Sequence, residues 1–179
     1  MKTTMIIGIA AMIGIVFLAP PASAQHLMDD DVWFKMKMNV KGYSISYEPE
    51  GYVIEPYSNV STVYVRFSPT ANPFQHTWEV WSLNATTGDW EDYSSGTEYI
   101  YGQRDGIVME WSPAWEASGW DYFNARINGF MKIKRDGLMT KSAKFTSTGC
   151  TVSGGEGVYG GCTVTGSAIK PDKLPFLYP

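Results

Sequence analysis

Alternation of apolar and polar residues is the feature that most limits the possible folds of this chain. In residues 32–38, 63–67 and 123–134, every second side chain shares an apolar face, while the positions between them are mostly polar or aromatic. A strand points successive side chains to opposite faces, so this two-residue period predicts strands with one packed face and one face in water. Gly129 lies within the longest run and predicts a bulge or a bend there.

Short turn signals separate the alternating runs. Asp105-Gly106 and Asp136-Gly137 each lie between two runs, and Asp-Gly is typical of tight hairpins because glycine accepts the positive φ of the turn. Thr87-Gly88 and Lys41-Gly42 predict two further turns. Residues 113–121 hold one helical turn at most, and no longer segment has helical periodicity.

These signals predict an all-β fold with about nine or ten strands joined mainly by short hairpins. We expect one domain over residues 25–170, followed by a Pro-rich C-terminal tail over residues 171–179. Successive hairpins favour an antiparallel meander that closes as a small barrel, because closure hides the sheet edges. A two-sheet β-sandwich is the alternative.

Residues 1–24 have the order of a cleavable secretory signal peptide. Lys2 precedes an uncharged apolar run over residues 5–18, and the small residues Ala22-Ser23-Ala24 follow. The apolar run is shorter than the roughly 20 residues of a membrane-spanning helix. We therefore expect residues 1–24 to be removed, no transmembrane helix to remain, and the protein to be periplasmic or extracellular.

The two cysteines, Cys150 and Cys162, predict a disulfide. An even number of closely spaced cysteines in an exported protein is typical of a disulfide. A hairpin centred on Glu156 would place Ser153 opposite Tyr159 and the two cysteines opposite each other, within disulfide reach. A metal pair would need histidines or further cysteines nearby, and the sequence has none there.

The charge of the chain argues against a nucleic-acid partner. The net charge is −4, and removal of Lys2 with the signal peptide makes it −5. A nucleic-acid-binding domain would instead carry a basic face.

Six of the seven tryptophans fall within residues 78–120, and this cluster predicts a ligand-binding region. Exposed aromatic rings stack on sugars or line apolar pockets, whereas the competing interpretation is that they fill a β core. Trp78 and Trp81 are separated by an odd number and should face opposite ways; Trp115 and Trp120 flank a predicted loop. The candidate ligand-binding residues are Trp78, Trp81, Trp90, Trp111, Trp115, Trp120 and Tyr101.

The evidence for catalysis is thin. The chain has two histidines, His26 and His76, and none of the common nucleophile or phosphate-loop motifs. Glu79 and Glu110 each lie beside tryptophans and are the weak candidates for a glycosidase carboxylate pair. Residues 29–31 are three aspartates without the spacing of a calcium loop, so we predict neither a metal site nor a cofactor.

The first functional hypothesis is therefore a non-enzymatic module that binds a glycan or a small apolar ligand. A structural or assembly protein of the cell envelope or exterior is the second, because Tyr-rich strands and a Pro-rich tail suit surface contacts and self-assembly. A small glycosidase is the third. An outer-membrane barrel fits less well, because of the disulfide and the lysines of residues 132–144. Asn59 and Asn84 begin sequences that match the N-glycosylation pattern.

Overall fold

The computed structural model describes residues 30–72, 74–103, 106–116, 122–136, 139–154 and 157–176. The predicted signal peptide lies outside these residues. The described part is almost entirely β structure, as the alternation predicts. Its strands are β1 (Val32–Glu48), β2 (Gly51–Pro69), β3 (Gln75–Leu83), β4 (Trp90–Gln103), β5 (Gly106–Trp111), β6 (Ala114–Glu116), β7 (Tyr122–Asp136), β8 (Met139–Gly154) and β9 (Tyr159–Ile169).

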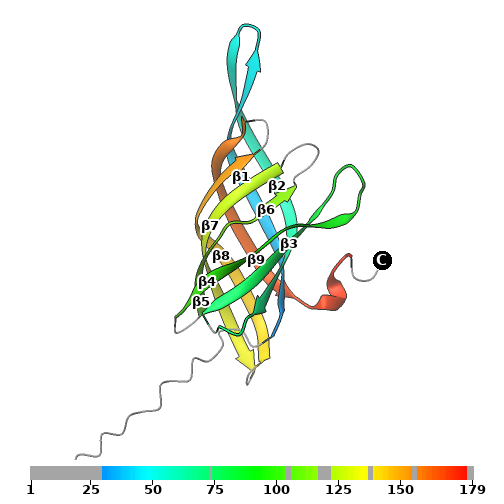
Figure 1. Ribbon diagram of the computed structural model, residues 1–179, viewed down its shortest axis with the longest axis vertical. Coiled ribbons are helices and arrows are strands. Elements are labelled where there is room, and N and C mark those ends of the chain that lie inside the picture. Colours follow the sequence, from blue (N-terminus) through cyan, green and yellow to red (C-terminus); the bar gives the residue numbers. More distant parts are fainter. Residues whose placement is uncertain are drawn as a thin grey trace, which may run out of the picture.

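The strands form one antiparallel sheet whose hydrogen bonds return to their starting point. The order is β5-β4-β3-β2-β1-β9-β8-β7-β6, and an additional pairing between β5 and β7 completes the ring. Neighbours along the chain are mostly neighbours in the sheet, so the predicted meander is confirmed. The sheet therefore closes on itself as a small barrel, as Figure 1 shows from the side.

The inward faces of the strands form one continuous core. Phe34, Met36 and Met38 of β1 alternate with exposed Lys35 and Lys37, which confirms the two-residue period. Small barrels have interiors that side chains can fill. Other buried members of this core are Val63, Val65, Phe67, Val80, Ile107, Met109, Phe123, Ile127, Met131, Phe145 and Val164.

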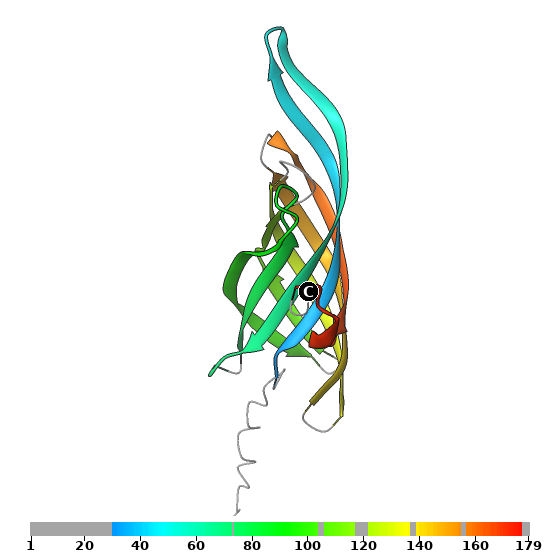
Figure 2. The same cartoon turned by 90° about the vertical axis from the view of Figure 1, so that its right-hand side faces the viewer.

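β1 and β2 continue well past the rest of the barrel as a two-stranded hairpin (Figures 1 and 2). β1 pairs with β9 only as far as Tyr43, and β2 pairs with β3 only from Tyr64 onward. We call residues 43–58 the projecting hairpin. Its strands remain paired with each other up to Glu48 and Gly51.

The turn predicted at Lys41-Gly42 is wrong, because β1 runs straight through these residues. Gly42 lies against β9 instead, where an added Cβ would collide with the carbonyl oxygen of Tyr159. Its glycine therefore permits close strand approach rather than reversal of the chain. The reversal occurs at residues 49–50, after which Gly51 has a φ of 133°.

β5 pairs with β4 and with β7 over only part of their length. β6 lies between β4 and β7 where β5 does not. Pro113 separates β5 from β6, and its carbonyl accepts a hydrogen bond of 2.9 Å from Ala125 N. On the other side, the Ser94 hydroxyl both donates to Ala114 O (2.9 Å) and accepts from Ala114 N (3.0 Å). One side chain of β4 thus takes the place of a strand partner for β6.

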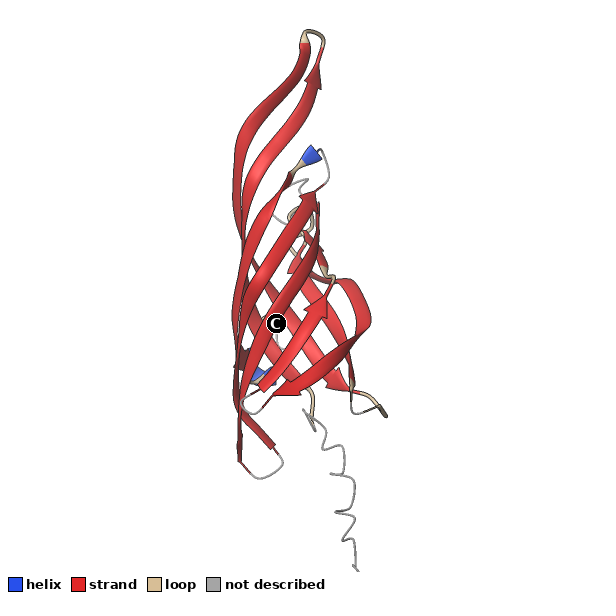
Figure 3. Cartoon of the chain, turned by 90° about the vertical axis from the view of Figure 1, so that its left-hand side faces the viewer, coloured by secondary structure: helices blue, strands red, loops and turns tan. Residues whose placement is uncertain are grey.

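The predicted disulfide between Cys150 and Cys162 is present and joins β8 to β9, with a Cα–Cα distance of 5.0 Å. Ser153 faces Tyr159, as the hairpin alignment predicts. The pairing of β7 with β8 shifts register between Asn128 and Gly129, but the unpaired residue, Thr148, belongs to β8, so the bulge lies in the partner strand beside Gly129. Figure 3 shows that strands make up almost all of the described wall.

The C-terminal segment leaves the barrel after β9 and folds back onto its outer surface. A short 3₁₀ turn, η2 (Pro171–Lys173), leads to Leu174 and Phe176, which pack on side chains of β1, β2, β3 and β4. The final residues of the predicted tail, 177–179, lie outside the described residues. The described part contains no helix with the length and apolar character needed to cross a bilayer.

Candidate functional site

The predicted aromatic cluster is divided between the core and the outer surface. Trp78 and Trp111 face inward and are buried, with ring centroids 5.8 Å apart. Trp115 was expected on a surface loop, but it belongs to β6 and is 0 % exposed, so that placement is wrong. Its neighbour is the inward-facing Phe123, 5.6 Å away. Trp120 lies outside the described residues.

Trp81 and Trp90 lie on the outer surface, where the C-terminal segment partly covers them. The Phe176 ring stacks on Trp81 with centroids 4.7 Å apart and an angle of 8° between the planes. The Tyr64 and Trp90 rings pack edge to face with their centroids 4.9 Å apart, and the centroids of the Trp33 and Phe176 rings are 5.6 Å apart. Phe176 thus covers Trp81 at one end of this outer aromatic surface. The other end, at Trp90, is open to the groove described next.

A groove of about 440 Å³ opens beside Trp90. It forms because β3 pairs with β2 only as far as Trp81, opposite Tyr64, so β2 has no partner in β3 from Val63 back toward the hairpin. We call this the aromatic groove. Its lining residues are Lys35, Val60, Ser61, Thr62, Tyr64, Leu83, Ala85, Trp90 and Glu116.

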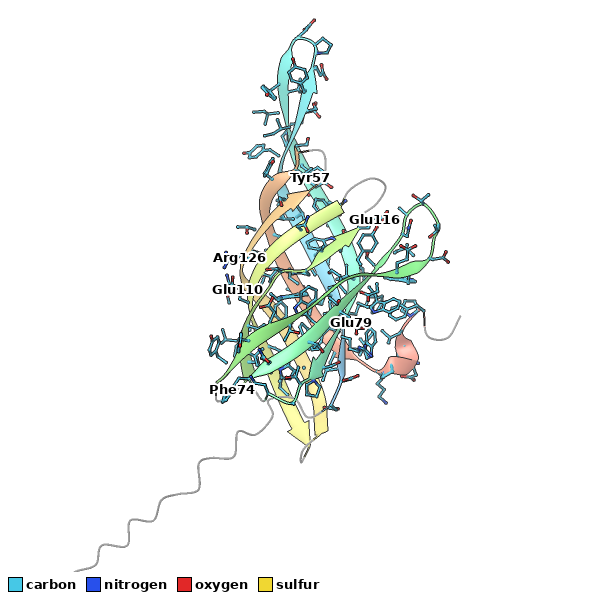
Figure 4. All side chains as sticks on the ribbon, in the orientation of Figure 1. Tyr57, Phe74, Glu79, Glu110, Glu116 and Arg126 are labelled. Atoms are coloured by element: carbon cyan, nitrogen blue, oxygen red, sulfur yellow. A yellow bond between two sulfur atoms is a disulfide. The ribbon has the colours of Figure 1, made fainter. Side chains whose placement is uncertain are left out.

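Glu116, labelled in Figure 4, is one of the lining residues of the aromatic groove and is held in place by hydrogen bonds. Its carboxylate accepts hydrogen bonds from the Tyr93 hydroxyl and from Ala85 N, the latter at 3.3 Å. Its own backbone N–H donates to the buried Ser82 hydroxyl at 3.2 Å. The carboxylate is therefore fixed in position while it still faces the groove, which suits it to accept hydrogen bonds from a ligand.

Tyr101, the remaining predicted ligand residue, lies at a second depression of about 490 Å³ on the opposite part of β4. β4 pairs with β5 only from Ile100 onward, so the wall opens next to Glu98. We call this depression the Glu98 hollow. Its lining residues are Glu98, Tyr99, Tyr101, Glu110, Ser112 and Arg126.

The two carboxylates proposed as a glycosidase pair, Glu79 and Glu110, do not line a common cleft among those described. Arg126 is the ion-pair partner of Glu110, and the two are labelled next to each other in Figure 4. Glu79 lies on β3, where Arg66 of β2 pairs with it at 2.5 Å. Each carboxylate thus neutralises an arginine of an adjacent strand, which is the ordinary role of a glutamate on a water-facing strand surface.

The Arg66–Glu79 pair has a further acidic neighbour. Burial raises the pKa of Asp92 above its ordinary value, the negative charge of Glu79 raises it further, and the Arg66 guanidinium lowers it. Arg66 also lies 3.7 Å from Asp31 and 5.6 Å from the centre of the Trp33 ring. The positive charge of Arg66 thus lies near several acidic groups at once, which favours a structural rather than a catalytic role for Glu79.

Sequence reasoning missed Glu98. It points inward at the opening of the wall, and its cross-strand partner is His76, which is 0 % exposed. Burial raises the pKa of Glu98 above its ordinary value of 4.5, and Glu110 raises it further, whereas the polar edge of Trp78 lowers it. Alternation within residues 98–101 could have placed Glu98 on the same face as Ile100, but it could not show the gap beside β5.

We expect Glu98→Gln to be more stable than the wild type at about pH 8 and to lose this advantage below about pH 4. A raised native pKa means that the native state holds the proton more tightly than the unfolded chain. Stability contributed by protonated Glu98 is therefore complete below pH 4.5, the ordinary pKa, and declines as the pH rises through the native pKa. Glutamine has no ionisable carboxyl group, so the stability of Glu98→Gln does not show this decline.

Thermal unfolding of both proteins across this pH range measures the effect. Ser95→Ala, at an exposed position of the same strand, removes no titratable group and is the control, so any change in its stability should be the same at every pH. A constant difference between Glu98→Gln and the wild type across the range would contradict the assignment.

Comparison with protein-family models, with curated proteins and with solved structures finds no match to this chain. Function must therefore be inferred from the geometry alone.

Proposed function

We propose that this is an exported, non-enzymatic binding protein that holds a glycan in the aromatic groove. The observation that carries the proposal is the meeting of the Trp90 and Tyr64 rings with a fixed carboxylate, Glu116, in one open groove. The volume of about 440 Å³ falls within the range of small-ligand sites. The disulfide supports the exported location, because such bonds persist in oxidising compartments.

A sugar suits this groove better than a purely apolar ligand. Sugar rings have apolar faces that stack on aromatic side chains, and hydroxyls that need hydrogen-bond partners. The groove offers Glu116 as an acceptor, Lys35 as a donor, and the hydroxyl of Thr62 as either. An apolar ligand would leave these groups without partners, which costs binding free energy.

Binding without hydrolysis follows from the composition of the groove. Glycosidases use two carboxyl groups on either side of the scissile bond. Among the described lining residues, Glu116 is the single carboxylate, and it accepts hydrogen bonds from Tyr93 and from Ala85 N. The described residues of the groove can therefore orient a sugar, but they do not supply the second group that hydrolysis requires.

We expect Trp90→Ala to weaken glycan binding about tenfold or more, which is the effect of losing roughly 1.4 kcal/mol of stacking free energy. The probe is an array of neutral and acidic oligosaccharides, followed by calorimetry with the best-bound sugar. Tyr99→Ala removes a more exposed ring, which lies in the Glu98 hollow, and is the control, because it should leave binding unchanged.

Two results would count against this function. One is that the folded wild type retains no sugar from the array. The other is that Trp90→Ala, with an unchanged melting temperature, binds as tightly as the wild type, which would place the ligand elsewhere.

A further inference from the structure

The aromatic groove continues into a second depression on the outer surface of the barrel. This depression has a volume of about 500 Å³ and lies over β9, between β1 and β8. It forms because β9 presents the short side chains of Thr165 and Ser167 between longer side chains of the two neighbouring strands. We call it the lysine trough, after its lining residues Lys35, Lys37 and Lys144.

The lysine trough and the aromatic groove meet at two residues. Lys35 of β1 and Thr62 of β2 line both depressions. Lys35 lies opposite Tyr64 on one side and opposite Ser167 on the other. Ser167 in turn lies opposite Lys144. Neighbouring strands are about 4.8 Å apart, so the row from Tyr64 to Lys144 spans about 14 Å. The two depressions therefore form one continuous surface, which is long enough for an oligosaccharide rather than a single sugar ring.

The lysine trough is positively charged, although the chain as a whole has a net charge of −4. Lys35, Lys37 and Lys144 are all exposed, and none of them forms an ion pair with another described residue. Aspartate and glutamate are absent from the described lining of the trough. Ammonium groups that gather without a counter-charge repel one another, and an anion bound among them is attracted to all of them.

Hydroxyl groups lie between the lysines of the trough. Thr165 of β9 lies opposite Lys37 on one side and opposite Thr146 of β8 on the other. The hydroxyls of Thr62 and Ser167 line the trough as well. Each hydroxyl can donate a hydrogen bond to an anionic oxygen or accept one from a sugar hydroxyl. The trough thus has partners for both the charged and the neutral groups of an acidic sugar.

Glu116 makes the two ends of the continuous surface different. Its carboxylate lines the aromatic groove beside Trp90, where it accepts hydrogen bonds from neutral hydroxyls and repels an acidic group. The lysines at the other end attract acidic groups. A ligand that fits the whole surface therefore places a neutral ring against Trp90 and its acidic groups beyond Lys35.

We infer that the ligand of the aromatic groove is an acidic oligosaccharide whose carboxylate or sulfate groups bind in the lysine trough. The inference rests on the proposed function, because the neutral end of the same ligand stacks on Trp90. Lys37 and Lys144 line the trough but not the aromatic groove, so they act on the acidic groups alone. A nucleic acid fits less well, because it carries a phosphate on every nucleotide and would bring one against Glu116.

Calorimetry with a matched pair of sugars tests the inference. One is an oligosaccharide that alternates uronic acids with neutral hexoses, and the other is the same compound with its carboxyl groups reduced to alcohols. The wild type should bind the acidic form about tenfold more tightly at low ionic strength, the combined effect of several exposed charge pairs. This preference should shrink at about 0.5 M salt, because salt screens exposed charges.

The variant K37Q/K144Q should lose most of this preference while it binds the reduced sugar as the wild type does. The matched control is K41Q/K134Q, which neutralises two exposed lysines that line neither the trough nor the aromatic groove and should keep the preference. Circular dichroism establishes that both variants are folded.

The outcomes separate this inference from the proposed function. If the wild type binds both sugars equally, or if K37Q/K144Q keeps the full preference, the inference is overturned and neutral glycan binding at Trp90 still stands. If the folded wild type binds neither these sugars nor any other, both proposals fail. Equally tight binding of single-stranded DNA that depends on Lys37 and Lys144 would overturn the identification of the ligand as a sugar.

Discussion

Trp111→Ala is expected to lower the free energy of unfolding by about 3–5 kcal/mol. Trp111 is fully buried at the centre of the barrel, and its ring lies edge to face against Phe67 (5.6 Å) and Phe145 (6.0 Å). Alanine would remove this packing and leave a cavity that a closed ring of strands cannot collapse to fill. Urea denaturation measures the loss as a lower midpoint with an unchanged slope.

Trp90→Ala is the control for this prediction, because Trp90 is only partly buried on the outer surface and its loss should cost less stability. Comparison of the two variants therefore distinguishes a tryptophan that packs in the core from one that lines the aromatic groove. If Trp111→Ala kept wild-type stability and instead lost glycan binding, Trp111 would be a ligand residue and the assignment of the interior to packing would be wrong.

Replacing both Cys150 and Cys162 with alanine is expected to lower the free energy of unfolding by about 2–3 kcal/mol. The bond joins residues 12 apart across β8 and β9, and it limits the freedom of the unfolded chain around this glycine-rich connection. Both half-cystines also pack against the core. Urea denaturation of the double variant, compared with the oxidised wild type, gives the difference.

A reducing agent provides an independent route to the same quantity. Reduction of the wild type should lower its stability to that of the double variant, and the same reagent should leave the double variant unchanged. Equal stability of the oxidised wild type and the double variant would show that the bond contributes nothing to the fold.

The fold could be predicted from the sequence where the signal is local. The alternation in residues 32–38 and 123–134 is a property of single strands, and it identified both the strands and their buried faces. The Cys150–Cys162 bond could be predicted because a hairpin aligns its own residues by simple counting. Gly129 marked the position at which the pairing of β7 with β8 is irregular, although the extra residue belongs to β8.

The errors occurred where distant parts of the chain decide the outcome. Gly42 resembles a turn residue in sequence, but it is needed because β9 approaches it closely. Trp115 follows Pro113 in a segment that resembles a loop, yet pairing with Phe123 makes it a strand residue and buries it. Neither contact leaves a periodic signal near the residue itself.

The candidate site was predictable in composition but not in position. Trp90 was predicted to be a ligand residue because it belongs to a dense aromatic cluster in the sequence. Glu116, the carboxylate of the groove, lies 26 positions further on and is placed there by the Ser82 and Tyr93 contacts across the sheet. Glu79 and Glu110 look alike in sequence, and only their arginine partners show that each has a local electrostatic role.

The pairing of β1 with β9 has a consequence for biosynthesis. Trp33 is aligned with Ile169, so the first and last strands of the barrel are direct neighbours. A chain that is synthesised from its N-terminus cannot complete the ring until its final strand has been made. Until then, the edge of β1 that pairs with β9 has no partner. Pairings between distant segments form slowly, and open edges recruit other chains. We therefore expect a chain that ends before β9 to aggregate rather than to form a smaller folded domain.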